Sequence, residues 1–165
     1  MVKFFLLILF LPFALFATTI TEKNWYTHPK IVKIREEFKS IEKSIKAKSY
    51  QTQKKSWSGA NVGEEITLYR DKKGKIKKLF LEGGSEDSYH KGEYFYKDGK
   101  LFFSYVLSRN YANCSSEIRS YFNNSKLIFR KTTNSKKCSL IPKMPWAIHN
   151  PLRYYKQFDQ EPDDE

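Results

Sequence analysis

Three repeats of one pattern between Glu64 and Thr133 constrain the fold more than any other feature of this chain. Each repeat is an alternating apolar segment, a short polar turn, a lysine and a second apolar segment. Asp-Gly between aromatic runs is a strong hairpin signal, because both central residues of a type I′ turn need positive φ. The pattern predicts three successive β-hairpins. Their turns are Asp71-Lys72-Lys73-Gly74, Asp98-Gly99 and Asn123-Asn124-Ser125.

The hairpins predict six strands of an antiparallel meander, with a loop over Gly83–Ser88 between the first two hairpins. Residues 49–63 are polar with two aromatic side chains and leave room for one further edge strand before Gly59. The six strands are expected at Glu65–Arg70, Ile76–Glu82, Gly92–Lys97, Leu101–Ser108, Glu117–Phe122 and Leu127–Thr132.

An amphipathic helix is predicted before the sheet. Thr27 and Pro29 stand where an N-cap and a first helical turn are expected. Apolar residues then recur at spacings of three and four, and basic residues fill much of the remainder. Such a helix covers one face of a sheet. A membrane-surface helix is the alternative, which the branched isoleucines disfavour. The apolar stripe is Ile31, Ile34, Phe38, Ile41 and Ile45.

Counting back from the turns assigns side chains to sheet faces, because successive residues of a strand alternate. The count aligns Tyr69, Tyr96 and Tyr121, and two residues earlier it aligns Thr67, Tyr94 and Arg119. Both faces of the middle hairpin are aromatic, so both need a cover. The helix is one cover, and a partner or the C-terminal stretch is the other. That stretch has the prolines of an extended segment and carries Met144, Trp146, Ile148, Leu152 and Tyr155.

The aligned tyrosines and nearby basic residues form a candidate binding face. Basic charge beside aromatic rings suits an anionic or stacking ligand. The ordinary explanation competes, since lysines at hairpin tips prevent edge aggregation and tyrosines on a sheet are mostly core. The face is open only if the helix covers the opposite side and the C-terminal stretch stays loose. Its residues are Tyr69, Tyr94, Tyr96, Tyr121, Arg119, Lys75 and Lys77.

Residues 1–17 have the build of a secretory signal peptide, with Lys3, an apolar run over Phe4–Phe16 and the small Ala17. The run is shorter than the roughly 20 residues that span a bilayer, although an uncleaved anchor is the alternative. No cysteine stands near the cleavage point, which disfavours a lipid anchor. We expect a secreted or periplasmic protein that begins near Thr18, with one domain over residues 18–158 and an acidic, disordered tail over 159–165.

The formal net charge of +12 favours anionic partners, and it also simply keeps a protein soluble. An anionic envelope polymer or another protein fits this charge. Because the chain is predicted to be exported, nucleic acid is not an expected partner. No stable membrane span is expected once the leader is cleaved.

Cys114 and Cys138 are the only cysteines, and they flank the third hairpin. An even count in an oxidising compartment predicts a disulfide, and a bridge closing about 24 residues contributes roughly 3 kcal/mol in the chain-entropy model. The alternative, a reactive thiol, lacks a Cys-x-x-Cys spacing.

The three histidines are isolated, so neither a metal nor a cofactor is predicted. His90 stands near Glu86, Asp87 and Glu93 and could form an acid–base pair with one of them, which keeps a small hydrolase as a rival. No known nucleophile or phosphate-loop motif is present.

Three segments of the chain carry a resemblance to known proteins. Two are clear, GEYFYKDGKLFFSYV (Gly92–Val106) and SEIRSYFNNSKLIFR (Ser116–Arg130), and the third, EEITLYRDKKGKIKKL (Glu64–Leu79), is fainter. The chain resembles a group of small secreted bacterial proteins of uncharacterised function, with a leader, one helix and a meander of tyrosine-rich hairpins. The resemblance covers roughly Ile31–Thr133 and implies a fold, not a chemistry.

The predicted fold is therefore α+β, with an N-terminal amphipathic helix packed on a six- or seven-stranded antiparallel meander and one disulfide. The predicted function is that of a non-catalytic binding or interaction module of the cell envelope. The alternatives are a small envelope hydrolase with an unrecognised site and a purely structural envelope component.

Overall fold

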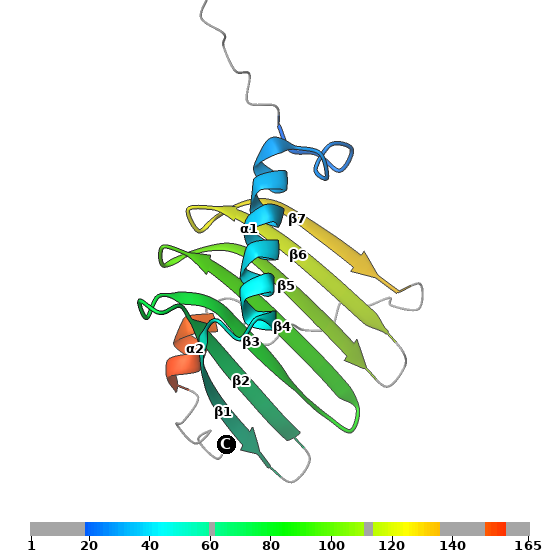
Figure 1. Ribbon diagram of the computed structural model, residues 1–165. Coiled ribbons are helices and arrows are strands. Elements are labelled where there is room, and N and C mark those ends of the chain that lie inside the picture. The colour runs from blue at the N-terminus through cyan, green and yellow to red at the C-terminus, as the bar shows by residue number, and fades with distance from the viewer. Residues whose placement is uncertain (1–18, 60–61, 111–113, 136–150, 158–165) are drawn as a thin grey trace, which may run out of the picture.

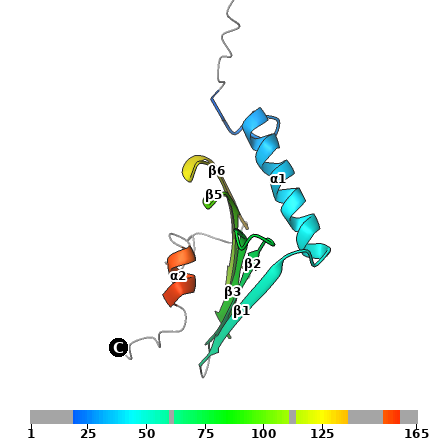
Figure 2. The same ribbon diagram turned by 60° about the vertical axis from the view of Figure 1, so that its left-hand side comes forward.

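A seven-stranded antiparallel sheet separates two helices that lie on its opposite faces (Figures 1 and 2). The computed structural model describes residues 19–59, 62–110, 114–135 and 151–157. Helix α1 spans Pro29–Lys46 and helix α2 spans Pro151–Gln157. In the part of the chain that is described, no helix is long and apolar enough to cross a membrane.

The strands follow one another across the sheet in chain order, which confirms the predicted meander. The edge strand expected between residues 49 and 63 is present as the first strand. Positive φ angles occur at both central residues of the last two turns, as a type I′ turn requires. The strands are β1 Gln51–Ser58, β2 Val62–Arg70, β3 Ile76–Ser85, β4 Ser88–Lys97, β5 Lys100–Asn110, β6 Ser115–Asn123 and β7 Lys126–Asn134.

The prediction of a loop over Gly83–Ser88 is wrong, because β3 continues to Ser85 and β4 begins at Ser88. The two glycines do not end the strand. They let the backbones of neighbouring strands approach closely, since a Cβ on Gly84 would lie 2.1 Å from the Ser88 carbonyl oxygen. The glycines here mark a close approach rather than a break.

Helix α1 has the predicted apolar stripe, with Ile31 and Ile41 buried against the sheet. The N-cap is His28 rather than Thr27, and its Nδ1 accepts a hydrogen bond from the Lys30 amide at 3.2 Å. The helix precedes every strand, but it is not at the N-terminus itself. Residues 22–27 form turns before it.

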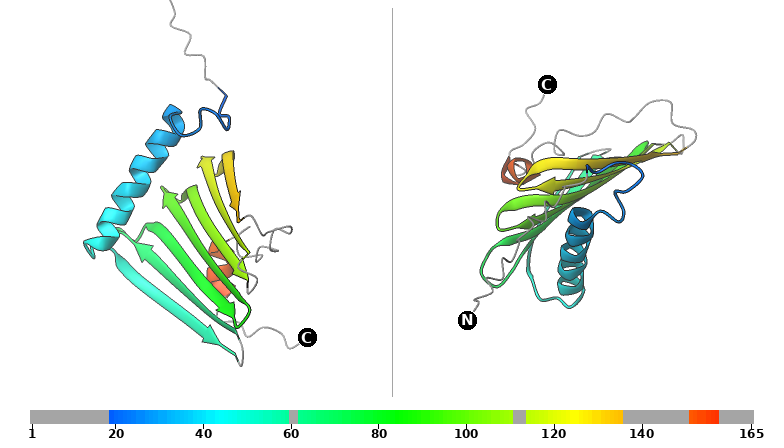
Figure 3. Two further views of the ribbon diagram at one scale, coloured as in Figure 1. Left: turned by 90° about the vertical axis from the view of Figure 1, so that its right-hand side faces the viewer. Right: turned by 90° about the horizontal axis from the view of Figure 1, so that it is seen from above.

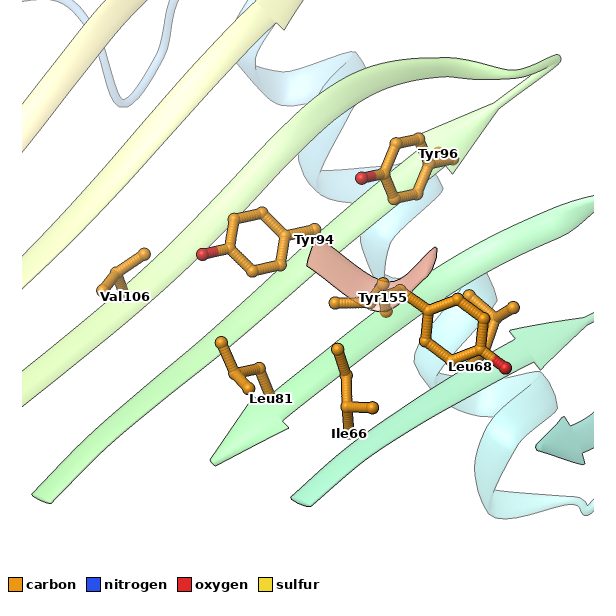
Figure 4. Packing of buried hydrophobic residues seen from close by; sticks show 8 residues of the cluster. Ile66, Leu68, Leu81, Tyr94, Tyr96, Val106 and Tyr155 are labelled. Atoms are coloured by element: carbon orange, nitrogen blue, oxygen red, sulfur yellow. The ribbon is translucent and has the colours of Figure 1, made fainter. Parts of the chain in front are cut away.

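Two apolar clusters fill the two sides of the sheet. On the α1 side the buried residues are Ile31, Ile41, Phe95, Phe102, Phe103 and Tyr121. On the α2 side, shown in Figure 4, they are Ile66, Leu68, Leu79, Leu81, Tyr94, Tyr96, Val106 and Tyr155. The middle hairpin therefore has the two covers that its aromatic residues require.

The predicted alignment of Tyr94 and Tyr96 with Tyr69 and Tyr121 is wrong. In the observed register Tyr69 lies in one cross-strand row with Lys78, Phe95, Phe103 and Tyr121, on the α1 side. Tyr94 and Tyr96 lie on the α2 side. The third turn comprises only Asn124 and Ser125, so Tyr121 stands three residues before its turn, as Phe95 does. A shift of one residue transfers a side chain to the opposite face.

The C-terminal stretch was predicted to be extended, but residues 151–157 form α2. Pro151 suits the first position of a helix, where its missing N–H would have no intrahelical partner. Leu152 and Tyr155 pack on the α2-side cluster, as a cover should. Met144, Trp146 and Ile148 lie outside the described residues, as do the predicted signal peptide and the acidic tail.

Candidate functional site

A groove of about 430 Å³ lies between α1 and strands β4–β6, and we call it the arginine groove. A volume in this range is typical of small-molecule sites. Figure 3 shows that α1 lies on one face of the sheet. The helix and the segment before it contribute Trp25, Tyr26, Ile34, Arg35, Phe38 and Lys39, and the sheet contributes Glu93, Phe103, Tyr105, Arg119 and Tyr121.

The segment before α1 is folded back onto the sheet and forms one wall of the groove. The Trp25 ring stacks on Phe129 with centroids 5.7 Å apart and an interplanar angle of 16°. It also meets Tyr121 at 6.0 Å and Tyr26 edge-on at 5.5 Å. The amide of Trp25 donates to the Thr21 carbonyl at 2.9 Å, which closes the local turn. Trp25 is thus held by both ring contacts and backbone bonds.

Each of the two arginines is held by a tyrosine ring. The Arg35 guanidinium lies 3.9 Å from the Tyr26 ring centroid and donates to the Tyr26 hydroxyl at 2.8 Å and the Tyr26 carbonyl at 3.0 Å. The Arg119 guanidinium lies 5.3 Å from the Tyr105 centroid and donates to Glu117 Oε2 at 2.7 Å. Stacking of this kind fixes the guanidinium plane in advance of any ligand.

The Tyr121 hydroxyl experiences the charges of both arginines. Burial raises the pKa of this hydroxyl, and the charges of Arg119 and Arg35 offset only part of that rise. The phenol therefore stays protonated at neutral pH and can donate a hydrogen bond. Arg35 bonds neutral groups of Tyr26, whereas Glu117 compensates part of the charge of Arg119. The two guanidinium groups and a neutral donor suit an anionic group.

Glu93 is the single carboxylate that lines the arginine groove, and two lysines neutralise it. Lys78 Nζ lies 2.8 Å from Glu93 Oε2 and 2.6 Å from Glu42 of α1, and Lys91 Nζ lies 2.7 Å from Glu93 Oε1. Burial raises the pKa of the Glu93 carboxyl, but the hydrogen bonds and charges of Lys78 and Lys91 outweigh it, so the pKa lies below its ordinary value. Glu93 therefore repels an anion in the groove only weakly.

The lowered pKa of Glu93 predicts a pH dependence of stability. A carboxyl whose pKa is lower in the folded state contributes stability above its unfolded pKa, near 4.5, and that stability is lost as the pH falls further. We expect Glu93→Gln to lose less stability than the wild type between pH 6 and pH 3 in urea unfolding. Glu36→Gln, which changes an exposed acid, should follow the wild type. The prediction would be contradicted if the free energy of unfolding changed with pH in the same way for all three proteins.

The structure brings together two of the seven residues of the predicted binding face. Tyr121 and Arg119 line the arginine groove. Tyr94 and Tyr96 are buried on the opposite side of the sheet. Lys75 pairs with Asp98 at 3.0 Å and Lys77 with Asp71 at 3.4 Å, both at the hairpin tips. Tyr69 lies on the α1 side but does not line this groove.

Nine of the eleven lining residues were not part of the predicted binding face, and they include Trp25, Tyr26, Arg35 and Tyr105. The adjacent Trp25 and Tyr26 in a polar stretch before a helix were the available signal. Nothing in the helical pattern distinguishes Arg35 from the other basic residues of α1. Its role follows only from the fold.

His90 contacts none of the acidic residues predicted beside it. Its Nε2 lies 3.2 Å from Oε1 of Glu64 in β2, while Glu93 faces the α1 side. Ser108 lies opposite His90 in β5 and is buried, and no hydrogen bond joins the two. Among the residues that the structure describes, no group of three His, Cys, Asp or Glu could hold a metal ion.

Cys114 is buried just before β6. Cys138 lies outside the described residues, so their pairing stays a prediction. No family model, curated protein or solved structure matches this chain, and the resemblance to small secreted bacterial proteins likewise stays a prediction.

Proposed function

We propose that this chain is a non-catalytic binding protein that acts in the periplasm or outside the cell, and that the arginine groove is its ligand site. The observation that supports the proposal best is the pair of arginines held by tyrosine rings, Arg35 and Arg119, which line one groove with Tyr121. Pre-positioned cations reduce the ordering cost of binding.

The lining of the groove indicates the chemistry of the ligand. Its aromatic and aliphatic side chains favour a flat apolar body, and its arginines favour a carboxylate or a similar anionic group. Lys39 adds a third cation at the helix. We therefore expect the ligand to combine an acidic group with a planar apolar portion.

The two alternatives are a small envelope hydrolase and a structural envelope component. The residues that line the arginine groove include no serine, cysteine or histidine, and Glu93 is held by two lysines. A hydrolase needs a free base or nucleophile, so this lining favours binding over hydrolysis. A structural component would have no need of a groove with pre-positioned cations.

A matched pair of probes tests the proposal. 2-Naphthoate is a planar aromatic carboxylate, and 2-naphthamide is nearly the same shape without the charge. We expect calorimetric titration of the mature protein to show about tenfold tighter binding of the carboxylate, since charged hydrogen bonds contribute about 1.5–3 kcal/mol. Equal affinity for the two probes would contradict the proposal.

Replacement of the arginines should remove this preference. We expect Arg35→Gln with Arg119→Gln to bind the two probes equally, and Arg119→Gln alone to lose part of the preference. Arg130→Gln, which removes one charge from an exposed residue of β7, should bind as the wild type does. A urea unfolding curve for each variant separates lost binding from lost folding.

Export should leave two marks on the mass of the purified protein. We expect the mature chain to begin near Thr18, and Cys114 and Cys138 to be bonded, which lowers the mass by two hydrogens. Intact-mass spectrometry before and after reduction measures both. A chain that retains residues 1–17 would contradict the predicted cleavage, and two free thiols in the unreduced, unfolded protein would contradict the bridge.

A further inference from the structure

A second groove, also about 430 Å³, lies on the other side of α1, and we call it the tip groove. It is bounded by the first turns of α1 and by the tips of the β4–β5 and β6–β7 hairpins. Its apolar side chains are Ile34, Leu101, Phe102, Phe122 and Ile128. This lining is aliphatic and phenyl, whereas the arginine groove is rich in tyrosine.

Four lysines surround this apolar lining, and few acids oppose them. Lys97 Nζ lies 2.6 Å from Glu37 Oε2, so its charge is compensated. Lys100 Nζ donates to the neutral side-chain oxygen of Asn124 at 3.3 Å. Lys30 and Lys33 are exposed, have no ion pair with any described residue, and stand where the first turn of α1 has no acidic residue. Lys30, Lys33 and Lys100 therefore have no ion pair with a described residue, although Glu37 and Asp98 also line the groove.

The two hairpin tips that bound the tip groove are bonded to each other. The Leu101 amide donates to Ser125 Oγ at 3.2 Å, in addition to the bond between Lys100 and Asn124. The Asp98 carboxylate of the same tip is engaged by Lys75 at 3.0 Å. The groove is thus formed before any partner arrives, which lowers the cost of docking.

We propose that the tip groove docks an acidic peptide segment of a partner protein, with apolar side chains as anchors between its acids. The lysines complement the acids, and the aliphatic lining suits leucine-like or phenylalanine-like anchors. An acidic polysaccharide or a phosphate backbone supplies the charge but has no side chains for this lining. The inference is independent of the proposed function, because the two grooves share only Ile34.

Selection from a library of random twelve-residue peptides on phage tests the proposal without a known partner. Phage that bind the double variant Lys33→Glu with Lys100→Glu are first removed from the library. The remaining phage are then selected on the wild-type protein. We expect the enriched peptides to carry a net negative charge and at least two large apolar residues. Enrichment of neutral or basic peptides, or no enrichment over the naive library, would overturn the proposal.

Fluorescence anisotropy of a labelled, enriched peptide then locates the site. We expect Lys33→Glu with Lys100→Glu to weaken its binding at least tenfold. A control, Lys72→Glu with Lys73→Glu, makes the same charge change at an exposed tip outside the groove and should weaken it less than threefold. Equal losses in both proteins would overturn the proposal. The proposal would also be overturned if the protein bound no peptide but bound polygalacturonate, and if Lys33→Glu with Lys100→Glu weakened that binding. Binding of 2-naphthoate should be unchanged in the variant with Lys33→Glu and Lys100→Glu.

Discussion

Replacement of Lys78 by alanine is expected to destabilise the fold by about 3–5 kcal/mol, the range observed when one partner of a buried ion pair is removed. The Lys78 side chain is 8% exposed and bridges Glu42 of α1 to Glu93 of the sheet. Without the ammonium group, Glu42 loses its partner, and the mostly buried Glu93 retains only Lys91. Urea unfolding of the purified variant measures the loss.

Lys91→Ala provides the matched control for Lys78. Lys91 also bonds Glu93, but its side chain is 30% exposed, so water can replace the bond and we expect a loss of about 1 kcal/mol or less. The double variant Lys78→Met with Glu93→Gln should recover part of the loss, because it leaves less charge buried. Equal losses for Lys78→Ala and Lys91→Ala would contradict the assignment of Lys78 as the buried link between helix and sheet.

Gly84→Ala is expected to destabilise the protein by about 3 kcal/mol or more, at or above the upper end of the usual cost of overpacking. The added Cβ would lie 2.1 Å from the Ser88 carbonyl oxygen and 3.0 Å from the Tyr89 Cα. Both are backbone atoms of β4, so relief requires the β3–β4 hairpin itself to move. Soluble yield and the urea midpoint report the effect.

Gly63 is the control for Gly84, because the two residues are directly paired in β2 and β3. A Cβ on Gly63 would meet only the Trp57 carbonyl oxygen, at an ordinary 3.7 Å. We expect Gly63→Ala to change stability by less than about 1 kcal/mol. A comparable loss at both positions would show that the close approach at Gly84 is not the cause.

Local sequence signals predicted the elements well but not the faces of the sheet. The turn sequences and alternating patterns located six strands, and the isoleucine stripe located α1, because these signals act within a few residues. The faces of Tyr94 and Tyr96 depend on the length of each turn and on a register shift beside Phe95. Such shifts have no marker in the sequence, and one residue reverses the result.

The candidate site was only partly predictable for a related reason. Arg119 and Tyr121 were identified from the third hairpin, where they share a face. Arg35 and Trp25 come from far earlier in the chain and reach the groove only through the packing of α1 on the sheet. Lys75 and Lys77 were expected to face a ligand, but acids at hairpin tips pair with them.

Nuclear magnetic resonance mapping of the arginine groove tests the central claim most directly. In the ¹⁵N-labelled mature protein, titration with 2-naphthoate should shift the amide signals of Arg35, Tyr105, Arg119 and Tyr121 and should saturate. Signals of Ile66 and Leu68 in β2, on the α2 side and away from the lining residues, should not move. Saturable shifts confined to the α2 side, or no saturable shift anywhere, would contradict the account.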